Sequence, residues 1–141
     1  MPLRCVDASL VVAWVVPSQR SAQATEVWLA YSQGEDEVVG PPLLYVETLS
    51  VIRRLASRGI LSEEEATGLV AEFLDLNIPT PTPPGLYLRA YEMAARYGLS
   101  RVYDACYLAL AELLSCNLLT LDQRLYNVVS EDLPWVRLVS R

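Results

Sequence analysis

Short apolar runs alternate with longer stretches of helical periodicity along the whole chain. The apolar runs have the length of buried strands, and the one at 77–79 is the weakest because proline cannot donate to a sheet ladder. Five such segments are predicted: residues 3–6, 38–39, 77–79, 118–121 and 136–139. The proline in the third segment indicates a place at the edge of the sheet.

The segments between these runs carry apolar residues at helical spacing. Ser62 and Glu65 form a capping box, and Gly59 and Gly98 are stop signals for the helices before them. Helices are therefore predicted over residues 10–15, 21–31, 42–58, 62–75, 86–97 and 103–114, with a further helix starting at Asp122. Strands alternating with helices predict an α/β fold in which helices cover both faces of a parallel sheet.

Two acidic residues fall on the apolar faces of predicted helices. Asp104 shares its face with Tyr107 and Leu108, and Glu47 is in line with Val51. A carboxylate on a core-facing stripe needs a partner, because burying an unpaired charge is costly.

Two further acids, Asp7 and Asp122, directly follow predicted strands. In open parallel sheets the functional crevice lies at the carboxyl ends of the strands, so the two side chains meet if their strands are neighbours. Either residue alone is equally well explained as the N-cap of the helix that follows it.

Arginine could neutralise the helical acids, with Arg101 or Arg54 as partner of Asp104 or Glu47. Buried ion pairs of this kind seldom stabilise a protein. One divalent cation explains all four acids together, whereas the structural alternatives must hold independently at each position. We therefore expect a metal site.

The composition excludes several kinds of catalytic site. The chain has no histidine, and all 11 of its basic residues are arginine. Catalytic triads, histidine-bearing zinc sites, Walker-type phosphate loops and Schiff-base lysines are thus excluded. Carboxylates holding Mg²⁺ or Mn²⁺ are the most available route to catalysis. The three cysteines, Cys5, Cys106 and Cys116, lack metal-ligand spacing and are expected to be reduced core residues.

The chain is hydrophobic for its size, with 52% hydrophobic residues and a mean hydropathy of +0.25. No apolar run reaches the roughly 18 residues that a membrane helix needs. We expect a cytoplasmic protein with one domain over residues 1–141 and apolar surface covered in a homodimer.

Four motifs together resemble those of PIN-domain ribonucleases, and most closely the VapC toxins of prokaryotic toxin–antitoxin pairs. They are Val-Asp-Ala-Ser around Asp7, Pro-Pro-Leu-Leu-Tyr-Val-Glu ending at Glu47, Tyr-Asp-Ala-Cys-Tyr-Leu-Ala-Leu-Ala around Asp104, and Leu-Leu-Thr-Leu-Asp ending at Asp122. The last two, at their close spacing, are the specific part, and the likeness covers essentially the whole chain.

This resemblance implies a PIN-like three-layer sandwich with about five parallel strands. It further implies Mg²⁺- or Mn²⁺-dependent cleavage of single-stranded RNA, a homodimer and a cognate antitoxin protein. Asp7, Glu47, Asp104 and Asp122 match the family's acidic quartet, and Ser9 and Thr120 match its accessory hydroxyl positions. Two alternatives stay open: a catalytically silent PIN-like interaction module, and a nuclease that acts on DNA. A receiver-type phosphorylation switch is a poor alternative, because its mechanism uses a lysine and this chain has none.

The net charge of −6 runs against the basic footprint of most nucleic-acid-binding proteins. Four of the negative charges belong to the expected metal site, and bound cations would reverse the local field. The candidate phosphate contacts are five arginines: Arg53, Arg54, Arg58, Arg101 and Arg124. Each of them also fits an ordinary solvated helix face.

Overall fold

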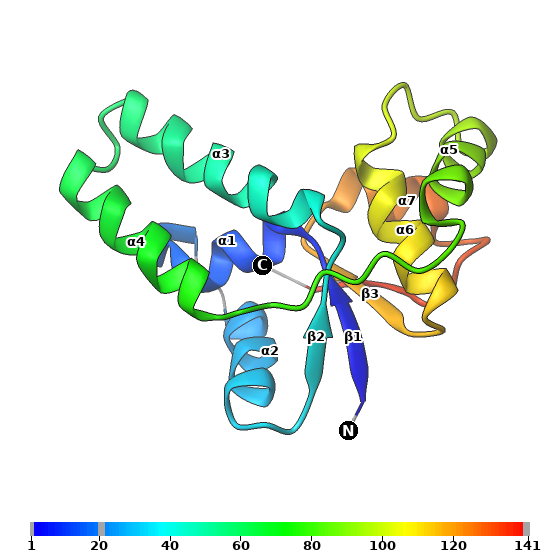
Figure 1. The fold of residues 1–141 in the computed structure, drawn as a ribbon, viewed down its shortest axis with the longest axis horizontal. Helices are drawn as coiled ribbons and strands as arrows, with labels where there is room; N and C mark the ends of the chain where they lie inside the picture. Colours follow the sequence, from blue (N-terminus) through cyan, green and yellow to red (C-terminus); the bar gives the residue numbers. More distant parts are fainter. Residues whose placement is uncertain (1, 20–21, 140–141) are drawn as a thin grey trace.

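A four-stranded parallel sheet forms the centre of the fold within residues 2–19 and 22–139, which the computed structural model describes. The strands lie in the order β2-β1-β3-β4, as Figure 1 shows in part. Their bounds are β1 Leu3–Val6, β2 Glu37–Val39, β3 Asn117–Thr120 and β4 Val136–Leu138. The α/β class and the parallel sheet are confirmed.

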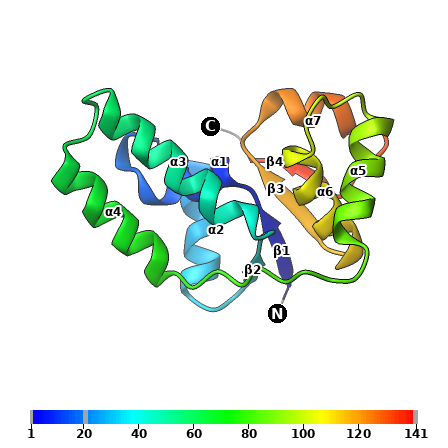
Figure 2. The ribbon, with the colours of Figure 1, turned by 45° about the horizontal axis from the view of Figure 1, so that its top comes forward.

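Helices cover both faces of this sheet. Their bounds are α1 Ala8–Val15, α2 Ala22–Ser32, α3 Leu43–Ser57, α4 Glu63–Asp75, α5 Leu86–Arg96, α6 Tyr103–Leu113 and α7 Gln123–Val129, with a short 3-10 helix at Pro17–Gln19. Figures 1 and 2 show α1 to α4 on one side of β1 and α5 and α6 on the other. The predicted layering is confirmed; the predicted start of α2 at Ser21 lies outside the described residues.

The capping signals in the sequence act where they were predicted. The Ser62 hydroxyl accepts a hydrogen bond from the Glu65 N–H (3.0 Å), and the Glu65 carboxylate accepts one from the Ser62 N–H (3.1 Å). Gly59 follows α3 with a φ of +72°, a left-handed conformation that glycine adopts without a steric penalty. These local signals make α3 and α4 a hairpin, and a small second core packs between this hairpin and α1.

The prediction of a strand at residues 77–79 was wrong, so the described sheet has four strands instead of about five. Ile78 is buried, but the carbonyls of this segment make separate hydrogen bonds instead of a strand ladder. The Ile78 carbonyl accepts from the Tyr45 hydroxyl (2.8 Å), and the Pro79 carbonyl accepts from the Gly40 N–H (3.1 Å). Because Pro79 has no N–H and Pro81 follows it, a ladder cannot propagate.

The two central strands place the functional end of the sheet. Cys5, Val6 and Leu118 are fully buried, and Val6 is in register with Leu119. The residues that follow these two strands therefore leave the same edge of the sheet side by side.

The three cysteines lie in or beside the core of the fold. Cys5 and Cys106 are buried, Cys116 is partly buried, and all three are free thiols, as predicted. Among the described residues, no helix combines the length and the apolar character needed to cross a membrane.

Candidate active site

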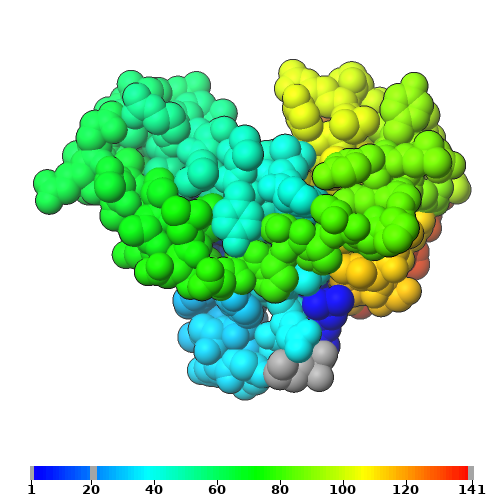
Figure 3. Space-filling view, in the orientation of Figure 1, coloured from blue at the N-terminus to red at the C-terminus, as the bar shows by residue number. Residues whose placement is uncertain are grey.

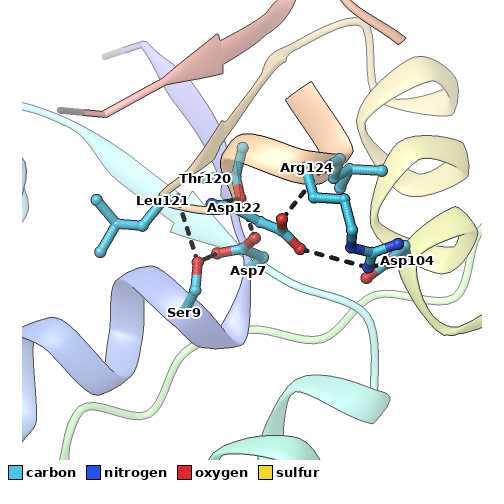
Figure 4. Close-up of polar contacts among 8 residues, drawn as sticks. Asp7, Ser9, Asp104, Thr120, Leu121, Asp122 and Arg124 are labelled. Carbon is cyan, nitrogen blue, oxygen red and sulfur yellow. Dashed lines mark hydrogen bonds and ion pairs between the residues drawn. The ribbon is translucent and has the colours of Figure 1, made fainter. Parts of the chain in front are cut away.

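Asp7 leaves the end of β1 and enters the protein interior instead of solvent. Asp7 is 7% exposed, and one of its carboxylate oxygens accepts hydrogen bonds from the Ser9 hydroxyl (2.6 Å) and the Leu10 N–H (3.1 Å). The other oxygen accepts a hydrogen bond from the Thr120 hydroxyl, at the end of β3. Figure 4 shows Ser9 and Thr120 reaching Asp7 from two different elements.

The pKa of Asp7 is raised from 3.8 to about 6, and burial is the largest cause of this rise. The hydrogen bonds from Ser9, Thr120 and Leu10 lower this pKa, and the nearby charge of Asp122 raises it. The carboxylate is therefore held in an environment that disfavours its charge, even though its oxygens are hydrogen-bonded.

Asp122 lies beside Asp7 as predicted, because β1 and β3 are neighbours. The Asp122 N–H donates to the Thr120 hydroxyl (2.9 Å), and the Asp122 carboxylate accepts from the Leu125 N–H (3.1 Å) as the N-cap of α7. Asp7 caps α1 in the same way. Capping is thus real at both positions, but it uses only part of each carboxylate and leaves room for a second role.

Asp104 sits in the first turn of α6 and faces Arg124 of α7. An Arg124 guanidinium nitrogen lies 3.4 Å from an Asp104 carboxylate oxygen and 3.8 Å from an Asp122 oxygen, so it bridges the two acids (Figure 4). Burial and Asp122 raise the pKa of Asp104, whereas Arg124 lowers it. Arg101 and Arg54 were named only as partners in the alternative to a metal site. The arginine that pairs with Asp104 is Arg124, because α7 starts directly after Asp122.

Glu47 points from α3 toward α6, as its helical spacing predicted. Its carboxylate accepts a hydrogen bond of 2.8 Å from the hydroxyl of Tyr107, which is 2% exposed. Burial raises the pKa of Glu47, the Tyr107 hydrogen bond lowers it, and the charge of Asp104 raises it. Burial, together with the same carboxylate, raises the pKa of the Tyr107 phenol, which therefore stays a donor.

A cavity of about 530 Å³ opens next to these acids. Its lining includes Glu47, Asp104 and Arg124, together with the segment from Tyr97 to Arg101 and Tyr103. Figure 3 shows the molecular surface hollowed between α3 and the chain that leads into α6. Asp7 lies deeper, toward the sheet.

The donor set suits a hard divalent cation, since it consists of carboxylate and hydroxyl oxygens. Asp122 raises the pKa of both Asp7 and Asp104, and Asp104 raises that of Glu47, so negative charge accumulates along the site. In the described part of the chain, no three acidic or cysteine side chains are already grouped at metal-ligand spacing. Arg124 occupies the space between two of the acids instead.

The five arginines proposed as phosphate contacts divide between three places. Arg101 and Arg124 line the cavity beside the acids. Arg53 and Arg54 line a separate groove of about 390 Å³ on the outer side of α3, where Arg53 also pairs with Glu63 (2.8 Å). Arg58 is exposed at the end of α3.

Sequence reasoning missed two contributions to this site. Tyr107 was noted only as apolar surface next to Asp104, although its position three residues later on the same helix face was a usable signal. The bridge from Arg124 to two acids had no local signal, because Asp104 is 20 residues away in the sequence.

Comparisons with known proteins agree with this geometry. The sequence profile of the PIN domain matches residues 4–130. Ribonuclease VapC3 from Pyrobaculum aerophilum is 35% identical over 122 residues, which cover 85% of this chain and 89% of the relative. Ribonuclease VapC9 from Mycobacterium tuberculosis and a VapC ribonuclease from Mycobacterium bovis are each 36% identical over 85 residues, 60% of this chain and 65% of each relative.

Both the profile and the first of these relatives span most of the chain, and the residues that the profile matches include all four acids of the site. Together with the parallel sheet and the acids at its carboxyl edge, they establish that this chain belongs to the PIN-domain family, in its group of VapC ribonucleases.

Proposed function

We propose that the protein is a metal-dependent endoribonuclease that cleaves single-stranded RNA, the toxin of a VapC-type toxin–antitoxin pair. The observation that supports this proposal is the chain of contacts along the carboxyl end of the sheet, in which Thr120 links Asp7 to Asp122 and Arg124 links Asp122 to Asp104. Glu47 and Asp104 line the open cavity beside these contacts. The ribonuclease names of its relatives support the substrate class.

We assign Asp7, Glu47, Asp104 and Asp122 as the residues that would hold Mg²⁺ or Mn²⁺. When bound, such a cation lowers the pKa of a coordinated water and offsets negative charge on the phosphate in the transition state. Ser9 and Thr120 act as positioning residues, because their hydroxyls hold both oxygens of Asp7. Tyr107 holds the Glu47 carboxylate toward the cavity.

Water is the nucleophile in this proposal, because a histidine-free chain lacks the usual base for activating a ribose 2′-hydroxyl. The expected products therefore carry 5′-phosphate and 3′-hydroxyl ends. Arg124 and Arg101, which line the cavity, are placed to contact the RNA phosphates.

The test is cleavage of a labelled pool of single-stranded RNA with Mn²⁺, Mg²⁺ or EDTA, with a matched DNA pool alongside. We expect RNA cleavage that requires metal and is lost in Asp104→Asn. Cleavage that persists in EDTA, or ends bearing 2′,3′-cyclic phosphate, would contradict the mechanism. Cleavage of DNA alone would favour the DNA-acting alternative, and a folded but inactive protein that binds a partner would favour the silent module.

The proposal extends to assembly and cellular location. We propose that the protein is cytoplasmic, forms a homodimer and also binds a small antitoxin protein. The two protein contacts are proposed because Tyr87, Leu88 and Tyr91 of α5 are 63–68% exposed and leave apolar surface uncovered. Sedimentation of the isolated protein at micromolar concentration tests the dimer, which a stable monomer would contradict. We further propose that residues 1–141 form one domain, since Leu69 packs against both hydrophobic cores.

A further inference from the structure

We propose that the aromatic wall of the cavity, defined as Tyr97, Arg101 and Tyr103, is a stacking surface for a nucleobase next to the cleaved phosphate. This inference rests on the proposed function, since it assumes that single-stranded RNA enters the cavity. It adds a base-binding subsite to the acidic site.

The position of Tyr103 is the first argument for this subsite. Tyr103 is the first residue of α6, immediately before Asp104, and both residues line the same cavity. Tyr103 is 48% exposed, so a large part of its ring is available for contact. A strand of RNA whose phosphate lies at Asp104 would place a neighbouring base within reach of this ring.

Cations accompany both aromatic rings of the wall. The guanidinium carbon of Arg101 lies 5.9 Å from the centre of the Tyr103 ring, and that of Arg96 lies 5.4 Å from the centre of the Tyr97 ring. Planar guanidinium groups and aromatic rings are the side chains on which unpaired bases stack. The wall thus offers π surface and positive charge together, in the same cavity that Glu47 and Asp104 line.

The charge of the protein indicates why such a subsite is needed. With a net charge of −6, the chain gains little from the release of counterions, which normally dominates affinity for nucleic acids. Stacking does not depend on this charge, and each stacked base contributes enough to change affinity severalfold. The cavity volume of about 530 Å³ also falls within the range of sites that bind small organic molecules.

The experiment measures binding of a short fluorescent single-stranded RNA by anisotropy, in the Asp104→Asn background with Mg²⁺ so that the RNA stays intact. We expect Tyr103→Ala to weaken binding by ~5-fold or more, which is the lower end for loss of one stacked base. Tyr103→Phe should bind like the parent because it keeps the ring. Tyr103→Leu, which keeps apolar bulk without a π face, should resemble the alanine variant.

Leu74→Ala is the matched control, since Leu74 is 46% exposed on α4, about as much as Tyr103, and does not line the cavity. It should leave binding unchanged. Melting temperatures of all variants should stay near that of the parent, because both Tyr103 and Leu74 are exposed.

An abasic scan identifies the base that stacks. Once the cleavage site has been mapped with the active enzyme, RNAs with one abasic ribose beside it are compared. Removing the stacked base should weaken binding of the parent about as much as Tyr103→Ala does, and should not weaken the alanine variant further. Raising the salt concentration should preserve the ratio between the two proteins.

Two results would overturn the inference, and they are distinguishable. If the wild-type enzyme cleaves RNA but Tyr103→Ala and Leu74→Ala bind it equally well, the subsite is wrong and the proposed function stands. If the wild-type protein neither binds nor cleaves single-stranded RNA, the proposed function fails and the subsite fails with it.

Discussion

Replacing Asp7 with asparagine distinguishes two roles for this residue: a buried carboxylate that holds a cation, and a helix cap. Asparagine caps a helix about as well as aspartate, so on the capping explanation alone Asp7→Asn should melt near wild type at every pH. The structure predicts otherwise, because the Asp7 carboxylate is 7% exposed and its pKa is raised to about 6.

The magnitude follows from this shift of the pKa. Moving the pKa of Asp7 from 3.8 in the unfolded chain to about 6 in the folded protein destabilises the ionised folded state by about 3 kcal/mol. Asparagine avoids this cost, but its amide cannot accept from Thr120 as the carboxylate does, a loss of about 1 kcal/mol. We therefore expect Asp7→Asn to be more stable than wild type by ~2 kcal/mol at pH 7 without metal.

The sign of the pH dependence can be checked independently. Because the folded pKa lies above the unfolded one, the contribution of Asp7 is most favourable below pH 3.8 and is lost as the pH rises through 6. The stability of wild type relative to Asp7→Asn should fall between these limits and become constant above them. Comparing the two proteins removes the contributions that Glu47 and Asp104 make to both.

Thermal unfolding in EDTA between pH 4 and 8, with and without millimolar Mn²⁺, is a sufficient assay. A difference of ~2 kcal/mol corresponds to roughly 4–8 °C for a chain of this size. Mn²⁺ should stabilise wild type, by about 2.7 kcal/mol when free metal is a hundredfold above its dissociation constant, and so raise its melting temperature. It should raise the melting temperature of Asp7→Asn far less. The reasoning would be refuted if the stabilities of the two proteins changed in parallel with pH, or if Mn²⁺ did not raise the melting temperature of wild type.

Three further predictions concern the other residues of the site. Asp104→Asn should abolish cleavage. Asp122→Asn keeps the cap of α7 and can act through water, so its cleavage rate should fall by about 10- to 100-fold. Equal losses of rate in single-turnover assays would contradict this ranking. Arg124→Ala should tighten Mn²⁺ binding in titrations because the competing guanidinium is gone, while changing stability by no more than about 1 kcal/mol; weaker binding would contradict this. Tyr107→Phe should destabilise the fold by roughly 1–2 kcal/mol in urea unfolding by removing the donor to Glu47, and an unchanged midpoint would show that water replaces the hydroxyl.

Much of the fold was predictable because its signals are local. The capping box at Ser62 acts within four residues, and the helical spacing that turned Asp104 and Glu47 inward was correct for both. The segment at 77–79 failed as a strand because a buried apolar residue does not make a ladder when prolines remove the donors. Local patterns therefore predicted which residues leave solvent, but predicted pairing only where backbone donors were present.

The sequence by itself determined the chemistry available to this protein: carboxylates and arginines without histidine or lysine, and an acid after each of two central strands. Only the tertiary structure decided how these groups meet. The contacts of Thr120 with Asp7, Tyr107 with Glu47 and Arg124 with Asp104 join residues 113, 60 and 20 positions apart. No local pattern encodes such pairs, because they depend on the order of the strands and on where the helices begin.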